Sequence, residues 1–307
     1  MLLVALTVVL ATAVGVVCQH RTPLAPVAAR AALTTALYAL MPFVSYVSLA
    51  HLQLTPGTGL GLVIPYLGLA AAGALAWLIG RRMSLARPSL GGLILVVIIA
   101  NTGNLGLPMA VVLLGSHALS HAVVFDQGVG GPMFFGPGFA VGAAFAVDRS
   151  AGQRFDPGER LRLFLTRNPP LWGAVAGLVV PASFAPAVLV SASHVIVVCL
   201  LVLGFFAVGV LLSEERTEDG APLLELPDRN VGLGLVLRFA VTPGLLAAAA
   251  LAGAGIPGAY LLGASMPSGV NSLTIGHVFG LDQRLIATMI VWSTIIVLVV
   301  GTAAYVI

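Results

Sequence analysis

The amino-acid sequence predicts an all-α integral membrane protein with about ten transmembrane helices. Of its 307 residues, 59% are apolar and only 8% carry a charge, and the mean hydropathy is +1.07. Soluble domains carry about 25% charged residues. Most of the apolar runs are about 18–25 residues long, which is the length that a helix needs to cross a bilayer. They lack the period-two alternation of outer-membrane β-strands, so the expected spans are helical.

The first five expected spans precede a central polar segment. They are expected at about residues 2–17, 27–50, 60–80, 90–114 and 118–147. The first run has no basic region before it and no small-residue cleavage site after it, so it is interpreted as a span rather than a signal peptide. The polar segment Asp148–Arg167 contains five arginines. We expect it to link a first unit, residues 1–147, to a second unit, residues 168–307.

The second five expected spans follow this linker. They are expected at about residues 169–184, 188–212, 231–251, 260–279 and 285–306. Because five is an odd number, the second unit must enter the membrane upside down relative to the first. This is the plan of two inverted five-helix repeats that many secondary transporters use.

The arginines predict the orientation of these spans. Every arginine except Arg238 lies in or beside a loop that follows an odd-numbered span, and the chain has no lysine. Basic residues favour the cytoplasmic side of a membrane. We therefore expect the Asp148–Arg167 loop to be cytoplasmic and both termini to be external, in a multi-pass protein of the cytoplasmic membrane.

Two polar interruptions lie within expected spans, at Asn101–Pro108 and Met266–Ser272. Glycine and proline weaken a helix and free backbone groups, which are tolerated at membrane depth only when they are buried in protein or line a wet cavity. Paired interruptions in two halves of a chain point to a transporter's binding site. The expected helix-break residues are Gly103, Gly106, Pro108, Pro267 and Gly269. The candidate substrate-binding residues are Asn101, Asn104, Asn271, Ser268 and Ser272.

These polar residues have an alternative interpretation. The asparagine amides can bind a substrate carboxylate, helped by the partial positive charge at half-helix N-termini. They can also satisfy the backbone groups that the breaks release, and one residue can do both. Met41 and Pro42 in the second span either line the same cavity or kink the helix.

Four further residues are candidates for ion coupling. Asp126 is the one acidic residue well inside a span, and Gln127 is next to it. An ionisable residue inside the membrane suggests a function, although Asp126 can also sit in a hydrated stretch near the interface. Arg238 either snorkels to the interface or pairs with Asp126 or a substrate. His277 follows the second break and, like His194, is either a pH sensor or a hydrogen-bonded core residue.

Several other classes of function lack their sequence patterns. The chain has no zinc-protease motif, no Gly-x-Ser-Gly and no pair of intramembrane aspartates, so we do not expect an enzyme. It has no phosphate-binding loop of the ATPase type, no metal or disulfide pattern, and no basic patch with aromatic residues for nucleic acid. We expect no cofactor, no metal and no nucleic-acid partner.

Several motifs, in their order along the chain, resemble the auxin efflux carrier family, which includes bacterial malonate-type permeases and plant PIN proteins. The pattern Asn-Thr-x-x-x-Gly-x-Pro at 101–108 is similar to the family's fourth span. Met266-Pro-Ser-Gly-Val-Asn-Ser272 and Phe279-Gly-Leu-Asp282 are similar to its ninth span. The other matching positions are Asn168-Pro-Pro170, Arg238 and Pro243.

The resemblance implies a fold and a function. The fold has broken spans 4 and 9 that cross at the membrane centre, a scaffold of spans 1, 2, 6 and 7, and a transport domain of spans 3–5 and 8–10. The implied function is elevator-type transport of a small organic anion by a homodimer surrounded by lipid. An alternative is a sodium- or proton-coupled carrier of the same crossed-helix fold, such as a bile-acid symporter or a sodium/proton antiporter. An antiporter usually needs an acidic pair or an Asp–Lys pair, which this chain lacks.

Overall fold

The computed structural model describes residues 2–52, 56–147, 156–166, 168–219 and 225–306. Within these ranges every regular element is a helix, apart from one isolated antiparallel bridge between Ala100 and Ser268. Six helices are long and apolar enough to cross a membrane, and three shorter apolar helices accompany them. The prediction of an all-helical, multi-pass membrane protein is therefore confirmed.

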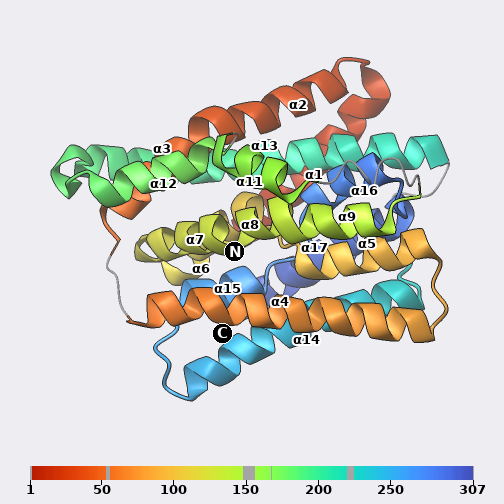
Figure 1. The fold of residues 1–307 in the computed structure, drawn as a ribbon. Coiled ribbons are helices and arrows are strands. Elements are labelled where there is room, and N and C mark those ends of the chain that lie inside the picture. Colours follow the sequence, from red (N-terminus) through yellow and green to blue (C-terminus); the bar gives the residue numbers. More distant parts are fainter. Residues whose placement is uncertain (1, 53–55, 148–155, 167, 220–224, 307) are drawn as a thin grey trace.

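The first half of the chain contains three long spans and two interrupted ones (Figure 1). The first span is α1 (Leu2–Arg21); the second is α2 (Ala25–Thr35), π-helical η1 (Ala36–Leu40) and α3 (Met41–Ala50); the third is α4 (Pro56–Arg82). The fourth is α5 (Arg87–Ile98), then π-helical η2 (Thr102–Gly106) and α6 (Leu107–Leu114) after a break. After η3 (Ser116–Ala118), the fifth runs through α7 (Leu119–Phe125), π-helical η4 (Asp126–Gly130), α8 (Gly131–Met133), π-helical η5 (Phe134–Gly138) and α9 (Phe139–Phe145).

The second half of the chain begins with a helix that lies inside the expected linker. Its elements are α11 (Pro157–Thr166), α12 (Pro169–Val179), η6 (Ala182–Phe184), α13 (Ala187–Asp219), α14 (Arg229–Leu251), α15 (Gly258–Ala264), α16 (Asn271–Phe279) and α17 (Gln283–Val306). A second break separates α15 from α16.

Three differences from the expected boundaries are the largest. The expected loop at 148–167 contains α11, in which Gly158 donates a 2.8 Å hydrogen bond to the Asp156 carboxylate at the start of the helix; residues 148–155 and 167 lie outside the described ranges. The helix expected to end near residue 184 stops at Val179, because Val180 is extended and Pro181 follows it. Helix α13 continues past the expected end at residue 212 to Asp219.

The helices pack as two groups. The first group consists of α1, α2, α3, α12 and α13, in which α12 packs on α3 and α13 packs on α1, α2 and α3. In the second, α4, α5 and α14 pack on one another, and α17, α9 and α16 complete the group. In Figure 1 the first group lies along one side of the molecule, α4, α14 and α15 lie along the other, and α6–α9 lie between them. This arrangement brings the breaks close to the boundary between the groups.

Candidate functional site

The two helix interruptions lie against each other and share hydrogen bonds. The Asn101 N–H donates to the Pro267 carbonyl over 2.8 Å, and the Gly269 N–H donates to the Ile99 carbonyl over 2.9 Å. Gly269 has no space for a side chain, because a Cβ there would lie 2.9 Å from the Ala100 carbonyl oxygen. The backbone groups that the two breaks release therefore satisfy each other in part.

Arg238 completes the hydrogen bonding of the breaks. Its guanidinium donates to the carbonyls of Val97, Ala264 and Met266 over 2.9, 2.9 and 3.0 Å, and its side chain is 1% exposed. Val97 and Ala264 lie at the C-terminal ends of α5 and α15, and Met266 lies two residues after the end of α15. The expectation that Arg238 snorkels to the membrane interface is wrong, because the carbonyls of two helix ends provide buried partners for its donors. Nor does it pair with Asp126.

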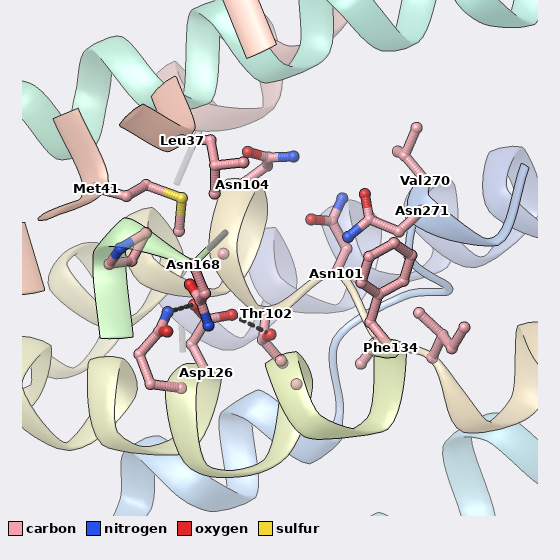
Figure 2. Close-up of a pocket in the computed structure, with 18 of the residues that line it drawn as sticks. Leu37, Met41, Asn101, Thr102, Asn104, Asp126, Phe134, Asn168, Val270 and Asn271 are labelled. Atoms are coloured by element: carbon pink, nitrogen blue, oxygen red, sulfur yellow. Dashed lines mark hydrogen bonds between the residues drawn. The ribbon is translucent and has the colours of Figure 1, made fainter. Parts of the chain in front are cut away.

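A cavity of about 300 Å³ lies beside the paired breaks. Its walls come from the second span, both breaks, the fifth span and the beginning of α12. Figure 2 shows Leu37, Met41 and Asn104 on one side of this space, Asp126 and Thr102 on another, and Asn101 beside Asn271. The lining residues are Leu33, Ala36, Leu37, Met41, Ile99, Ala100, Asn101, Thr102, Gly103, Asn104, Asp126, Gln127, Gly130, Gly131, Phe134, Phe135, Asn168, Pro170, Gly269, Val270 and Asn271.

All four π-helical segments of the described chain contribute to this lining. Three of them, η1, η2 and η4, end two residues before a proline, namely Pro42, Pro108 and Pro132. A proline has no N–H and displaces the carbonyl of the preceding turn, and helices accommodate this with a local π-bulge. The helices are thus widened by their own prolines where they face the cavity. The positions of these prolines are therefore a sequence pattern that could have identified the second and fifth spans as walls of the cavity.

Asp126 is the acidic group of the cavity. Its side chain is 8% exposed, and its two carboxylate oxygens accept hydrogen bonds from the Thr102 hydroxyl and, over 2.8 Å, from the Gln127 amide. Gly130 permits this contact, because a Cβ there would lie 2.5 Å from the Thr102 hydroxyl oxygen. Asp126 is therefore held by neutral donors of the fourth and fifth spans. It lies within the cavity wall, and not at an exposed helix end.

Asn101 has an unused donor in this cavity. Its side chain is 5% exposed, and its Nδ2 has no hydrogen-bond partner among the described residues. A buried polar atom without a partner costs about 1–3 kcal/mol, so the site favours a ligand that accepts from it. Asn271 is exposed at the first position of α16, and Figure 2 shows its amide next to that of Asn101.

The other candidate residues divide into two sets. Asn104, Gly103, Gly269 and Gln127 line the cavity. Ser268, Ser272, Gly106, Pro108, Pro267, Arg238 and His277 do not. Ser268 and Arg238 instead bind backbone around the breaks, Ser272 is buried with its hydroxyl unpartnered among the described residues, and His277 is exposed.

Much of the apolar wall of the cavity has no recognisable pattern in the sequence. Leu33, Leu37, Phe134 and Phe135 lie in spans that are rich in apolar side chains, so composition does not distinguish them from their neighbours. Asn168 was noted only as part of a motif. Met41, in contrast, lines the cavity, which is one of the two roles considered for it. Nowhere in the described ranges do three or more histidine, cysteine or acidic side chains form a group suited to a metal ion.

The fold and the cavity together define the class of protein. The chain is a helical, multi-pass membrane protein in which two interrupted helices meet beside a buried polar cavity. Residues 159–305 match a family model described as "Membrane transport protein". The chain is also 26% identical over 247 residues to an uncharacterized transporter of Methanocaldococcus jannaschii, a match that covers 76% of this chain and 73% of that protein. In both comparisons the chain is similar to membrane transport proteins, and the resemblance to the auxin efflux carrier family that its motifs predicted is confirmed.

Proposed function

We propose that this protein is a secondary transporter that moves a small organic anion across the cytoplasmic membrane by an elevator-type mechanism. The main support for this proposal is that helix N-termini, and not helix C-termini, face the cavity. The carbonyl ends of α5 and α15 are bound by Arg238 and Ser268, away from the cavity. The helical segments that follow the two breaks begin at Thr102 and Asn271, and both residues line it. Helix N-termini carry partial positive charge and attract anions.

The cavity offers two further features for a carboxylate with an apolar body. The Nδ2 of Asn101 is a free donor, and Asn271 lies beside it. Leu37 and Met41 provide apolar surface across the cavity from these amides, and Phe134 provides apolar surface beside them. A volume of about 300 Å³ is at the small end of ligand pockets. The proposed substrate is therefore a small mono- or dicarboxylate, of which an auxin-like indole acid is one example.

The proposed movement follows from the two packing groups. The scaffold would be spans 1, 2, 6 and 7, and the transport domain would be spans 3–5 and 8–10, as two inverted repeats with breaks that cross at the membrane centre. In support, the cavity has walls from both groups, Met41 and Pro170 on one side and Asn101 and Asn271 on the other. We further infer a homodimer through the scaffold, external termini, and a cytoplasmic segment at 148–167.

Asp126 is the proposed coupling group. No arginine or histidine lines the cavity within the described residues, so an anionic substrate and an ionised Asp126 would repel each other at close range. Protonation of Asp126 would remove that repulsion and add one positive charge to the loaded carrier. Gln127 would hold the carboxyl in place in both states.

A second candidate function is a carrier coupled to sodium. Asp126, the Thr102 hydroxyl and the unpartnered Oε1 of Gln127 are oxygen ligands in one buried cluster, and hard cations prefer such oxygen ligands. Replacement of sodium by choline distinguishes the two functions. Uptake that persists in choline favours the proton-coupled or uncoupled carrier, and uptake that requires sodium favours the symporter.

A binding screen of the purified protein tests the proposed substrate class. Thermal unfolding is measured with mono- and dicarboxylates, indole acetate included, and each acid is paired with its neutral amide, such as malonate with malonamide. We expect stabilisation by at least one acid and none by its amide, because a ligand that binds the folded state stabilises it by an amount that grows with the ratio of ligand concentration to dissociation constant. Equal stabilisation by acid and amide, or flux of the amide in proteoliposomes, would overturn the anion proposal.

A further inference from the structure

A second cavity, of about 400 Å³, lies where α3 ends and α7 begins, and shares no lining residue with the central one. We call it the histidine cavity. Four of the chain's six histidines line it, with four serines and three apolar side chains. The lining residues are Val47, Ser48, His51, Ser116, His117, Leu119, Ser120, His121, Val190, Ser193 and His194. Neither the family match nor the proposed transport function assigns a role to this cavity.

The polar groups of the histidine cavity are only partly used by the protein. Ser48 is 6% exposed, and its hydroxyl has no hydrogen-bond partner among the described residues. His51 binds the Ala185 carbonyl through Nε2 over 2.8 Å, which leaves its Nδ1 for another contact. Ser193, in contrast, donates to the Val190 carbonyl of its own helix. The cavity thus has a buried, unpartnered hydroxyl and imidazole nitrogens for which a ligand can provide partners.

The charge of this region favours an anion over a cation. No Asp, Glu, Lys or Arg occurs in residues 45–60, 112–125 or 179–196, which include all of the lining. The titratable groups that face the cavity are therefore its four histidines, and Tyr260 of α15 packs edge-on against His121 at 6.1 Å between ring centroids. A tyrosine is uncharged over the pH range in which histidines titrate. Protonated histidines in this cavity would have no acidic side chain in these segments to neutralise them.

We propose that the histidine cavity is a second anion-binding site, which takes a small inorganic or carboxylate anion when its histidines are protonated. Protonated imidazole donates through both ring nitrogens, and charge-assisted hydrogen bonds to an anion are the stronger kind. The anion would contact α3 and α13 of the first packing group and also α7, which lies between the two groups. Binding therefore ties α7 to the first group and raises the unfolding temperature. This inference does not depend on the substrate of the central cavity.

The test uses the purified full-length protein in detergent. Thermal unfolding is followed while sodium sulfate, and separately sodium malonate, is titrated at pH 5.5 and pH 7.5 at matched ionic strength. We expect sulfate to bind more weakly at pH 7.5 than at pH 5.5, because histidine changes its charge over this range and a neutral imidazole cannot donate a charge-assisted hydrogen bond to the anion. An effect of sulfate alone identifies an inorganic-anion site, and an effect of both identifies a site that also accepts carboxylates.

Variants separate this site from the central one. The double substitution His121→Gln and His194→Gln should remove the pH-dependent sulfate effect, and His117→Gln, at an exposed position, should weaken it if the double variant does not fold. His277→Gln, outside both cavities, and Asn101→Ala, in the central one, should leave it intact. Absence of any sulfate effect at pH 5.5 would overturn the proposal. So would a sulfate effect that survives the histidine substitutions and disappears in Asn101→Ala.

Discussion

The two helix interruptions are paired in space but use their polar residues in opposite ways. In the first, the Asn101 side chain lies in the cavity with its Nδ2 unpartnered among the described residues. In the second, the Ser268 hydroxyl donates to the Val96 carbonyl over 2.7 Å. The Ser268 N–H donates to the Ser293 hydroxyl over 3.1 Å. Ser268 is completely buried. Asn101 of the first break thus offers a donor to a ligand, whereas Ser268 of the second break holds the two breaks together.

This difference teaches how irregular backbone can persist in a membrane protein. The carbonyl ends of α5 and α15 would each need water or a partner, and Arg238 and Ser268 supply the partners from within the protein. With the carbonyl ends bound, the N-terminal ends at Thr102 and Asn271 remain for the cavity. If this division is correct, substitutions around the breaks should affect either stability or ligand binding, but seldom both.

The largest effect is expected from Arg238→Met, which should destabilise the protein severely. The change leaves three buried carbonyls without their partner, and each unsatisfied group costs about 1–3 kcal/mol. Thermal unfolding in detergent measures the loss. Arg82→Met, at an exposed position near the end of α4, is the control and should unfold as the unmodified protein does. An Arg238→Met protein of normal stability would show that the breaks do not depend on this residue.

Asn101→Ala should weaken binding of the substrate and leave the fold intact. If its amide donates to a charged carboxylate, its loss should cost about 1–3 kcal/mol of affinity, which is on the order of 5–150-fold. The backbone hydrogen bond from Asn101 to Pro267 does not involve the side chain and remains. Affinity is measured with whichever acid stabilises the protein in the binding screen.

A matched control for this variant is Ser272→Ala. Ser272 is completely buried and, like Asn101, has a polar side-chain atom without a partner among the described residues, but it does not line the cavity. Its replacement should not change affinity. Equal affinity in the unmodified protein and in Asn101→Ala would reduce Asn101 to a structural residue of the first break.

The sequence predicted the helical spans and both breaks because these depend on local composition. Long apolar runs, and the glycine and proline residues that interrupt them, can be recognised in short segments of the sequence. The partners of Arg238 could not be predicted in this way, because Val97 and Met266 come from different halves of the chain. For the same reason the four histidines at 51, 117, 121 and 194 did not suggest one cavity. Composition gave no reason to group them, since three different spans bring them together.

Ser268→Ala should have a smaller effect, and on stability rather than on binding. It removes one buried hydrogen bond to the Val96 carbonyl, which is worth about 1 kcal/mol and somewhat more if the carbonyl stays unsatisfied. Its backbone bond with Ser293 remains. The unfolding temperature should fall slightly while the substrate affinity stays the same. A loss of affinity without a loss of stability would place the substrate at the second break and would contradict the division between the two breaks.

Asp126→Asn should change substrate affinity least of all and yet alter how transport depends on pH. Asparagine has nearly the same size as aspartic acid, and its oxygen can still accept from the Thr102 hydroxyl. A flip of the Gln127 amide would place its unpartnered Oε1 against the new NH₂ group, so the cluster can keep its hydrogen bonds. The asparagine cannot lose or gain a proton. If Asp126 titrates during the transport cycle, proteoliposomes containing the variant should show flux that no longer varies with pH, while binding at acidic pH is retained. Thr102→Val keeps the titrating group and removes only its hydrogen bond, so it should move the midpoint of the pH profile without abolishing the dependence. A profile unaltered by Asp126→Asn would mean that Asp126 shapes the wall of the cavity and carries no proton.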